Sequence, residues 1–462
     1  MMKMKSRVES RESRAIDSTG FVVERFSAVL HASFDLVSKP ALKRSTTNFA
    51  IALILCLFCA EGFAQVLVKK NAYATMTSIP PFTGDPSLAT QATKILSSDL
   101  DRSGWFKIVG SGAGELNIVG VANRSEGGFS LEVRAFSRSR SVTTEGATVS
   151  GGGGQVYGKR FTGNSDGQLR QVVHALADDI VESLTNPKQK GIAQTKIAFI
   201  SNRSGKKELY VMDYDGYNVR QITTDGSISA RPRWSADRNR IVYLSYKSRW
   251  PDVYVIDLAS GRRTRVANYP GLNSGGAFSP GGGQIALVLS KDGNPELYTM
   301  ASGGGSLNRL TSTKGAESSP CWSPDGSRIA FSYDGFGLPN ICIMSAQGGE
   351  PTRVTAGGYY TEPDWSPSSN APMGNMIACV GRVGRSFQLF TFDPSSPSAT
   401  FQQRTNDGAD NMDPTFAPDG RHLVFSRTAG YRSQLYVLDL ITGDATNLNL
   451  NLSDCVEPAW SR

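Results

Sequence analysis

The segment Pro320-Cys-Trp-Ser-Pro-Asp-Gly-Ser-Arg-Ile-Ala-Phe331 contains the pattern that decides the fold. An aromatic and a small residue precede a Pro-Asp-Gly turn, and an apolar strand follows it. The pattern recurs about every 44 residues, with one longer interval of about 51. The aromatic residues at its centre, called anchors below, are Trp234, Phe278, Trp322, Trp365, Phe416 and Trp460. A repeat of this length indicates a β-propeller in which each repeat forms one blade.

The order of the repeats predicts how the ring closes. Each repeat has four short apolar or β-branched stretches, separated by turn pairs such as Asp-Gly. The first repeat begins at the strand of Ile197 without a preceding anchor, and no strand follows Trp460. We therefore expect the last anchor to complete the first blade, which removes open sheet edges. The sequence predicts an all-β six-bladed β-propeller over residues 191–462.

Residues 65–190 follow a different pattern. The pair Asp85-Pro86 begins one helix, which ends at Gly104, because Asp caps a helix, Pro suits its first turn and Gly suits its end. Two strands form a predicted hairpin around Gly127-Gly128, and a second helix runs from Asp166 to about residue 184. We interpret this region as a small α/β domain with an N-terminal tail.

Residues 1–64 have the character of an export leader. The apolar run 49–60 follows Lys43 and Arg44, and Gly62-Phe63-Ala64 supplies the small residues that a signal peptidase reads. The run is too short to span a bilayer comfortably, so we expect a signal peptide cleaved after Ala64 and a periplasmic mature protein. An uncleaved membrane anchor is the alternative. The polar residues 1–42 are interpreted as lying before the true start codon.

Charge and cysteine content exclude some classes of function. The formal net charge is +8, but the basic residues form no dense run, so nucleic-acid binding is not expected. The cysteines outside the leader are widely spaced and lack metal-ligand spacing, so no metal site is predicted. We expect buried free thiols at Cys321, Cys342, Cys379 and Cys455.

One motif resembles a catalytic element. Gly163-Asn-Ser-Asp-Gly167 matches the GxSxG nucleophile elbow, which needs a buried preceding strand and a histidine partner. The preceding residues are polar, and His174 and His422 are the histidines outside the leader. Ser165 and Asp166 are better interpreted as helix N-cap residues. We expect no enzyme activity.

The predicted channel mouth is the candidate binding site. Loops that enter the innermost strands of a propeller line this mouth. Counting back from the anchors places these residues there: Arg231, Asn273, Glu317, Glu362, Asn411, Asp413 and Glu457. The acidic members are expected at equivalent places around one opening, where they would suit a partner presenting Lys or Arg, or a bound cation. Ordinary solvated loops are the alternative, and no other cofactor is predicted.

Two further segments narrow the class of propeller. Ile95-Leu-Ser-Ser-Asp-Leu-Asp-Arg-Ser-Gly-Trp-Phe106 resembles the first helix and turn of the TolB family. Val173-His-Ala-Leu-Ala-Asp-Asp-Ile-Val-Glu-Ser-Leu-Thr185, followed by Lys196-Ile-Ala-Phe199, resembles that family's junction between helix and propeller. The repeats resemble those of the same family, and the likeness covers roughly residues 65–462. The long leader, the Gly-rich loop 151–154 and the enlarged fifth repeat depart from it.

The resemblance implies a role that composition does not. TolB-like proteins are monomeric periplasmic scaffolds of the Tol-Pal system, which supports outer-membrane integrity, constriction at cell division and protein import. By this likeness the channel mouth binds a Pal-like peptidoglycan-associated lipoprotein, and the tail binds a TolA-like inner-membrane protein. The tail residues are Gln65, Val66, Leu67, Val68, Lys69 and Lys70.

Two other classes remain as alternatives. One is the propeller of a serine-peptidase-like protein, which would need an α/β-hydrolase domain that we do not expect in this sequence. The other is a periplasmic propeller that binds glycans or peptides.

Overall fold

A computed structural model describes residues 74–138, 142–144, 147–149, 154–185, 188–367, 372–448 and 454–462. The chain divides into two units, Met1–Ala64 and Gln65–Arg462, and everything described below belongs to the second. The predicted signal peptide and the tail residues 65–70 therefore lie outside the described residues. Within the described part, no helix combines the length and the apolar character needed to cross a membrane.

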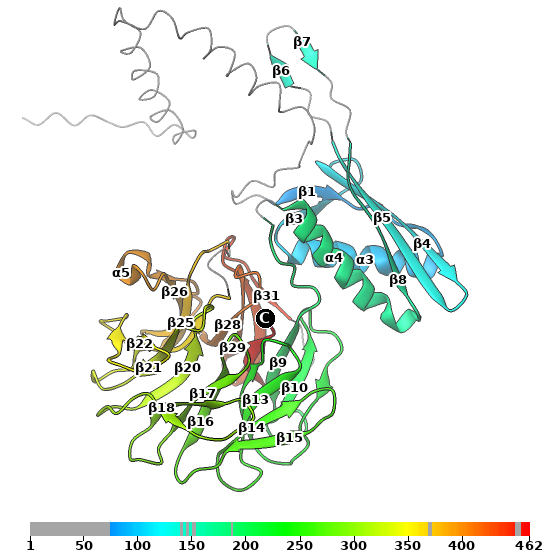
Figure 1. Ribbon diagram of the computed structural model, residues 1–462. Coiled ribbons are helices and arrows are strands. Elements are labelled where there is room, and N and C mark those ends of the chain that lie inside the picture. Colours follow the sequence, from blue (N-terminus) through cyan, green and yellow to red (C-terminus); the bar gives the residue numbers. More distant parts are fainter. Residues whose placement is uncertain are drawn as a thin grey trace, which may run out of the picture. The chain divides into compact units, whose positions relative to one another are not determined.

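The first domain is one sheet with both helices, α3 (Pro86–Arg102) and α4 (Leu169–Leu184), packed on it (Figure 1). The strand order is β3-β1-β4-β5-β8, with β2 paired to β4 and a separate hairpin of β6 and β7. The strands are β1 (Thr75–Ser78), β2 (Thr83–Gly84), β3 (Phe106–Val109), β4 (Leu116–Ser125), β5 (Gly128–Ser137), β6 (Val142–Thr144), β7 (Ala147–Val149) and β8 (Gln155–Gly163).

The two helices begin in different ways. Asp85 caps α3 as predicted, because its Oδ1 accepts the backbone N–H of Leu88 at 3.0 Å. The second helix starts as a 3₁₀ turn, Asp166–Gln168, before α4, and the Ser165 side chain makes no capping hydrogen bond. Asp166 instead forms an ion pair with Arg124 at 2.8 Å. Ser165 therefore occupies the predicted N-cap position without a side-chain capping bond, whereas Asp166 is the first residue of the turn.

The second domain is a ring of six four-stranded sheets, as predicted (Figure 1). The first three blades contain these strands: blade one, β32 (Cys455–Trp460), β9 (Lys196–Ser201), β10 (Glu208–Asp213) and β11 (Arg220–Gln221); blade two, β12 (Ser229–Trp234), β13 (Arg240–Ser245), β14 (Asp252–Asp257) and β15 (Arg263–Ala267); blade three, β16 (Asn273–Phe278), β17 (Gln284–Leu289), β18 (Glu296–Ala301) and β19 (Asn308–Arg309).

The other three blades repeat this antiparallel order. Their strands are, in blade four, β20 (Glu317–Trp322), β21 (Arg328–Tyr333), β22 (Asn340–Ser345) and β23 (Thr352–Arg353); in blade five, β24 (Tyr360–Trp365), β25 (Ile377–Val383), β26 (Ser386–Phe392) and β27 (Gln402–Gln403); and in blade six, β28 (Asp410–Phe416), β29 (His422–Ala429), β30 (Arg432–Asp439) and β31 (Ala445–Asn447). A short helix, α5 (Pro397–Thr400), lies in blade five between β26 and β27.

The last strand closes the ring, which confirms the predicted arrangement. β32 pairs antiparallel with β9, and Trp460 lies opposite Ile197. The Trp460 indole N–H donates to Thr195 Oγ1 at 2.7 Å, and Ser461 Oγ accepts the backbone N–H of Lys196 at 2.9 Å. Arg462 extends the closure by pairing with Asp364 of blade five. The seam thus combines a strand ladder, a buried aromatic ring and an ion pair.

Buried aromatic anchors also join neighbouring blades. The indole N–H of Trp234 donates to the carbonyl of Ala459 at 2.9 Å, and that of Trp322 to the carbonyl of Ala277 at 3.0 Å. Each bond crosses from one inner strand to the preceding one. The four cysteines predicted as free thiols are buried and form no disulfide.

Candidate partner-binding site on the propeller

Every inner strand carries a bulge at the same place. The register with the second strand shifts between the fourth and the first residue before each anchor, so two residues of the inner strand face one of its neighbour. The residue three before the anchor takes a positive φ of 50–68°. These bulge residues are Arg231, Gly275, Ser319, Glu362, Asp413 and Glu457. Such a repeated bulge bends all six inner strands alike.

Contacts between bulge residues show that they converge on the ring axis. The Arg231 guanidinium of blade two donates to Ser319 Oγ of blade four at 3.1 Å, so it reaches beyond the neighbouring blade. Its backbone N–H donates to Glu457 Oε2. Glu362 Oε2 accepts the backbone N–H of Asp413 at 3.0 Å. Three carboxylates and one guanidinium therefore line the channel together.

The three channel carboxylates outnumber the one guanidinium, that of Arg231, which lines the channel with them. Burial, reinforced by the charge of Asp413, raises the pKa of Glu362 to about 8, although the Asp413 backbone N–H and Arg231 oppose the shift. Burial and the charge of Asp413 also raise the pKa of Glu457, against the backbone N–H and charge of Arg231. The channel is therefore acidic in composition but retains protons on part of its acids near neutral pH.

Three of the predicted mouth residues are buried at the start of their inner strands and do not occupy the bulge position. Asn273, Glu317 and Asn411 lie five residues before their anchors, at the start of the inner strands, and they are buried. Glu317 Oε1 accepts Thr313 Oγ1–H at 2.8 Å, so its carboxyl group faces the seam beside blade three. Its blade presents Ser319 at the bulge instead. Counting back from the anchors did not separate the two positions because polar residues occur at both.

A second feature gathers at the end of the ring where the inner strands begin. This end, called the mouth face, holds the loops before the inner strands and those between the second and third strands of each blade. Of the exposed large hydrophobic residues in the described propeller, one, Tyr217, lies at the opposite end. The others lie on the mouth face: Ile228, Tyr246, Trp250, Leu272, Phe336, Leu338, Val383 and Tyr431.

Sequence reasoning missed these apolar residues and two of the bulge residues. Trp250 has 75% of its surface exposed. A tryptophan within a polar turn could have indicated an exposed binding residue from the sequence alone. The bulge had a signal too, because a proline follows it in five of the six repeats. These prolines are Pro232, Pro320, Pro363, Pro414 and Pro458.

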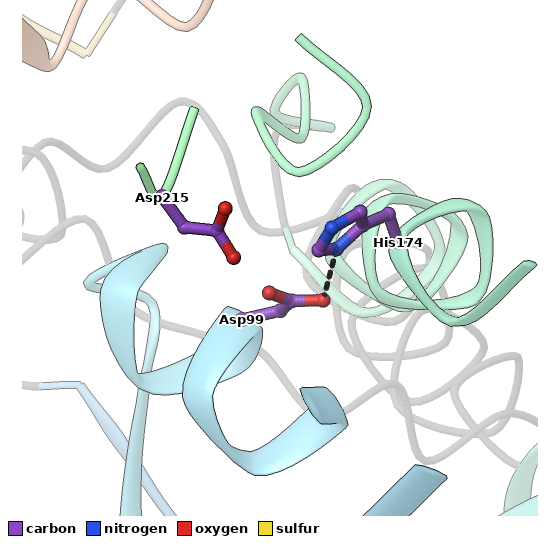
Figure 2. Close-up of side chains that lie close together, drawn as sticks. All are labelled: Asp99, His174 and Asp215. Carbon is purple, nitrogen blue, oxygen red and sulfur yellow. Dashed lines mark hydrogen bonds and ion pairs between the residues drawn. The ribbon is translucent and has the colours of Figure 1, made fainter. Parts of the chain in front are cut away.

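A buried polar cluster ties the first domain to blade one. His174 Nδ1 of α4 lies 2.7 Å from Asp99 Oδ2 of α3, and the Tyr214 hydroxyl of the propeller donates to Asp99 Oδ1 at 2.7 Å. Arg170 pairs with Asp215. Figure 2 shows Asp99, His174 and Asp215 pointing toward one another. Their possible ligand atoms lie within 4.8 Å of one another, so the group could hold a metal ion. Both carboxylates are already engaged by protein groups, so the cluster serves as a polar tie.

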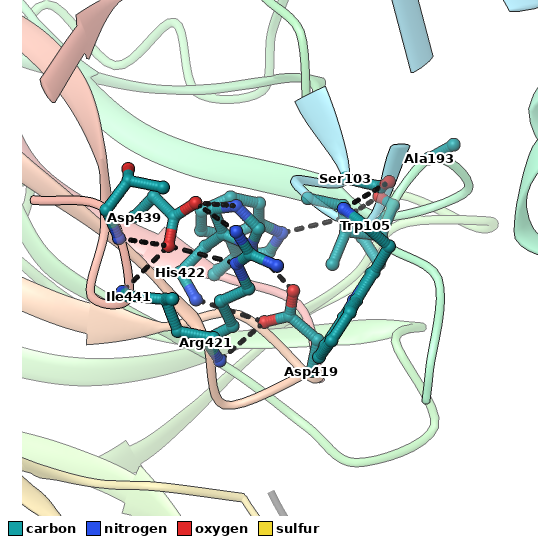
Figure 3. A network of polar contacts seen from close by, with 12 residues as sticks. Ser103, Trp105, Ala193, Asp419, Arg421, His422, Asp439 and Ile441 are labelled. Carbon is teal, nitrogen blue, oxygen red and sulfur yellow. Dashed lines mark hydrogen bonds and ion pairs between the residues drawn. The ribbon is translucent and has the colours of Figure 1, made fainter. Parts of the chain in front are cut away.

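A second tie joins the first domain to blade six (Figure 3). Arg421 donates two hydrogen bonds to Asp439, at 2.9 and 2.6 Å, and its guanidinium stacks over the Trp105 ring at 4.8 Å. His422 Nδ1 lies 2.6 Å from Asp419 Oδ2. Burial opposes the charge of Asp439, but the Arg421 hydrogen bonds and nearby positive charge hold its pKa below the usual value. Both histidines of the described chain are thus held against aspartates.

Comparison with known proteins agrees with this architecture. The profile of the TolB β-propeller domain matches residues 181–462, which is more than half of the chain. The chain belongs to the TolB propeller family. A TolB crystal structure from Acinetobacter baumannii superimposes with a TM-score of 0.71 over 84% of this chain and 97% of that chain. At 23% sequence identity, this likeness shows the shared fold.

Curated TolB proteins match part of the sequence. A TolB homologue of Chlorobium chlorochromatii is 33% identical over 196 residues, which cover 42% of this chain and 41% of the relative. The Tol-Pal system protein TolB of Geobacter metallireducens is 33% identical over 207 residues, which cover 40% of this chain and 47% of the relative. The chain spans less than half the length of these curated TolB relatives.

Proposed function

We propose that this chain is a non-catalytic periplasmic scaffold of the Tol-Pal system. It links a TolA-like inner-membrane protein to a Pal-like peptidoglycan-associated lipoprotein, and so supports outer-membrane integrity and constriction at cell division. The names of matched TolB relatives supply the system, because several are Tol-Pal system proteins. The propeller supplies the Pal-like site, and residues 65–70 supply the TolA-like site.

The concentration of exposed apolar residues on the mouth face is the observation that carries this proposal. Trp250, Phe336 and Tyr431 project from loops of three different blades on that face. Apolar residues around a polar, charged centre are typical of a protein-binding surface. Aromatic side chains of this kind often contribute much of the binding energy. A folded partner docking over the channel would cover them together.

The candidate catalytic residues are better explained by the fold. His174 lies in the tie to blade one, and His422 bonds to Asp419 at the start of β29. Ser165 precedes a 3₁₀ turn. The Nδ1 atom of His174 contacts Asp99 and that of His422 contacts Asp419, so neither Nδ1 atom faces a serine. These observations support a binding role over acyl transfer.

Two binding measurements test the proposal. A double Trp250→Ala, Phe336→Ala variant should lose at least tenfold in affinity for the Pal-like lipoprotein of the same cell while keeping its melting temperature. Met76→Ala, which truncates an exposed residue of the first domain, is the control. Deleting residues 65–73 should abolish co-purification with the TolA-like protein. Unchanged binding in both variants would refute the proposed role.

A further inference from the structure

A cavity lies among the anchor residues, at the end of the inner strands opposite the mouth face. This anchor-end cavity has a volume of about 290 Å³ and is lined by residues of all six blades. Its lining residues include Trp234, Trp322 and Trp460. This volume lies just below the usual range for small-ligand pockets, so it suits a small body or a single side chain.

The aromatic walls are fixed before any ligand arrives. The indole N–H of each of the three tryptophans already donates to a protein oxygen, at 2.7–3.0 Å. The indole N–H groups therefore need no ligand partner, and all three tryptophans are held in place, with at most 9% of each residue exposed. A preorganised apolar wall lowers the entropy cost of binding.

Positive charge dominates the polar groups of the cavity. Arg233, Arg462 and Lys190 line it together with one acidic side chain, that of Asp364. Asp364 Oδ2 accepts the backbone N–H of Phe416 at 2.8 Å and also pairs with Arg462. The single acid is therefore already neutralised by the end of the chain.

Two cationic groups remain without a carboxylate partner. Arg233 donates to the carbonyl of Pro232 at 2.9 Å, and within the described residues no ion pair is found for it or for Lys190. The carboxyl group of Glu362 also interacts with the charge of Arg233. Burial raises the pKa of Glu362 to about 8, so this group is largely protonated near neutral pH. Unused donors on a guanidinium favour a planar anion such as a carboxylate.

We propose that the anchor-end cavity binds a carboxylate carried on an aromatic or aliphatic body. The carboxylate meets Arg233 and Lys190, and the body packs against the tryptophan rings. The ligand is either a free small carboxylate or an acidic side chain of a peptide inserted from the anchor end. This site has the opposite charge to the mouth and does not depend on the proposed Tol-Pal partners.

Calorimetric titration of the mature chain with matched probes tests this site. N-acetyl-L-phenylalanine should bind saturably, and its neutral amide should bind at least tenfold more weakly. A blocked Gly-Phe-Glu-Gly peptide and its Gln counterpart form the second arm, which distinguishes a peptide side chain from a free carboxylate. Binding of either carboxylate above its neutral counterpart supports the site, and no such difference in both arms overturns it.

Variants then assign the binding to the cavity. Arg233→Gln with Lys190→Gln should weaken the carboxylate at least tenfold, whereas Arg262→Gln, which changes an exposed arginine outside the cavity, should not. Lys190→Gln alone alters an exposed side chain and should reduce affinity severalfold without affecting folding. Binding that survives the double substitution overturns the assignment. The Trp250→Ala, Phe336→Ala variant should bind the probe normally, which separates this result from the proposed function.

Discussion

The carboxyl groups of Glu296 on β18 and Glu317 on β20 meet in the buried seam between blades three and four. In each of the two glutamates, the Oε2 atom is buried and has no hydrogen-bond partner. Burial and the adjacent Glu296 raise the pKa of Glu317 to about 8, although Thr313 opposes the shift. One proton shared by the pair would satisfy both oxygens, as in other close carboxyl pairs.

This pair predicts that the stability of the fold falls between about pH 4.5 and pH 8. The folded pKa of Glu317 exceeds its unfolded value of 4.5, so unfolding releases a proton between these values and stability falls as pH rises through them. Glu317→Gln removes the titration and should stabilise the fold by roughly 1–3 kcal/mol at pH 8. The gain should be smaller at pH 5. Melting curves at both pH values measure it.

The control for the pair is Glu350→Gln, which neutralises an exposed glutamate of blade four. It should follow the wild-type pH dependence. Equal melting shifts for the Glu317 and Glu350 variants would show that the buried pair does not share a proton.

The tie between the first domain and blade one should behave as a buried network. Asp99→Asn removes charge from the acceptor of both His174 and Tyr214, and we expect a loss of about 1–3 kcal/mol. Asp101→Asn on the same helix alters a half-exposed ion pair with Lys107 and should cost less than about 1 kcal/mol. Denaturant unfolding compares them. If the two variants lose equal stability, Asp99 is not a tie.

Ring closure should depend on the buried anchor Trp460 and should not depend on exposed tryptophans such as Trp250. Trp460→Ala removes a buried ring from the seam and should cost about 3–5 kcal/mol, as for other aromatic truncations in a core. Deleting residues 454–462 removes the whole of β32 and should leave an aggregating or protease-sensitive propeller. Trp250→Ala removes an exposed ring and should leave the melting temperature unchanged. Calorimetry that ranks the two single variants equally would contradict this closure.

The sequence repeat predicted the blades and their order. It did not predict features that depend on tertiary contacts, such as the burial of a single polar residue. The anchors alone predicted the six blades and the closure by Trp460. The first repeat lacks an anchor and the last anchor lacks a following strand, so in a closed ring the two must complete the same blade. Asp99 is indistinguishable in sequence from a solvated helix residue, yet it is buried because Tyr214, far along the chain, reaches it. The positive φ at Glu362 is likewise a property of the bulge and not of a residue type.

The mouth acids predict a pH dependence of partner association. Burial and the charge of Asp413 raise the pKa of Glu362 to about 8, so Glu362 gains negative charge as pH rises through that value. The same two causes raise the pKa of Glu457. A partner that presents Lys or Arg should therefore associate faster at pH 9 than at pH 7, most clearly at low salt. Stopped-flow or biosensor kinetics with the Pal-like lipoprotein measure this rate.

Replacing both glutamates isolates their contribution from the titration of the partner. Glu362→Gln with Glu457→Gln should keep the fold and remove most of the increase in association rate between pH 7 and pH 9. Glu350→Gln should retain that increase, because its carboxylate is exposed and lies outside the channel. The dissociation rate should change less than the association rate, since long-range charge acts mainly on encounter. If the double variant and the control show the same pH profile at both salt concentrations, the partner does not feel the channel and docks elsewhere.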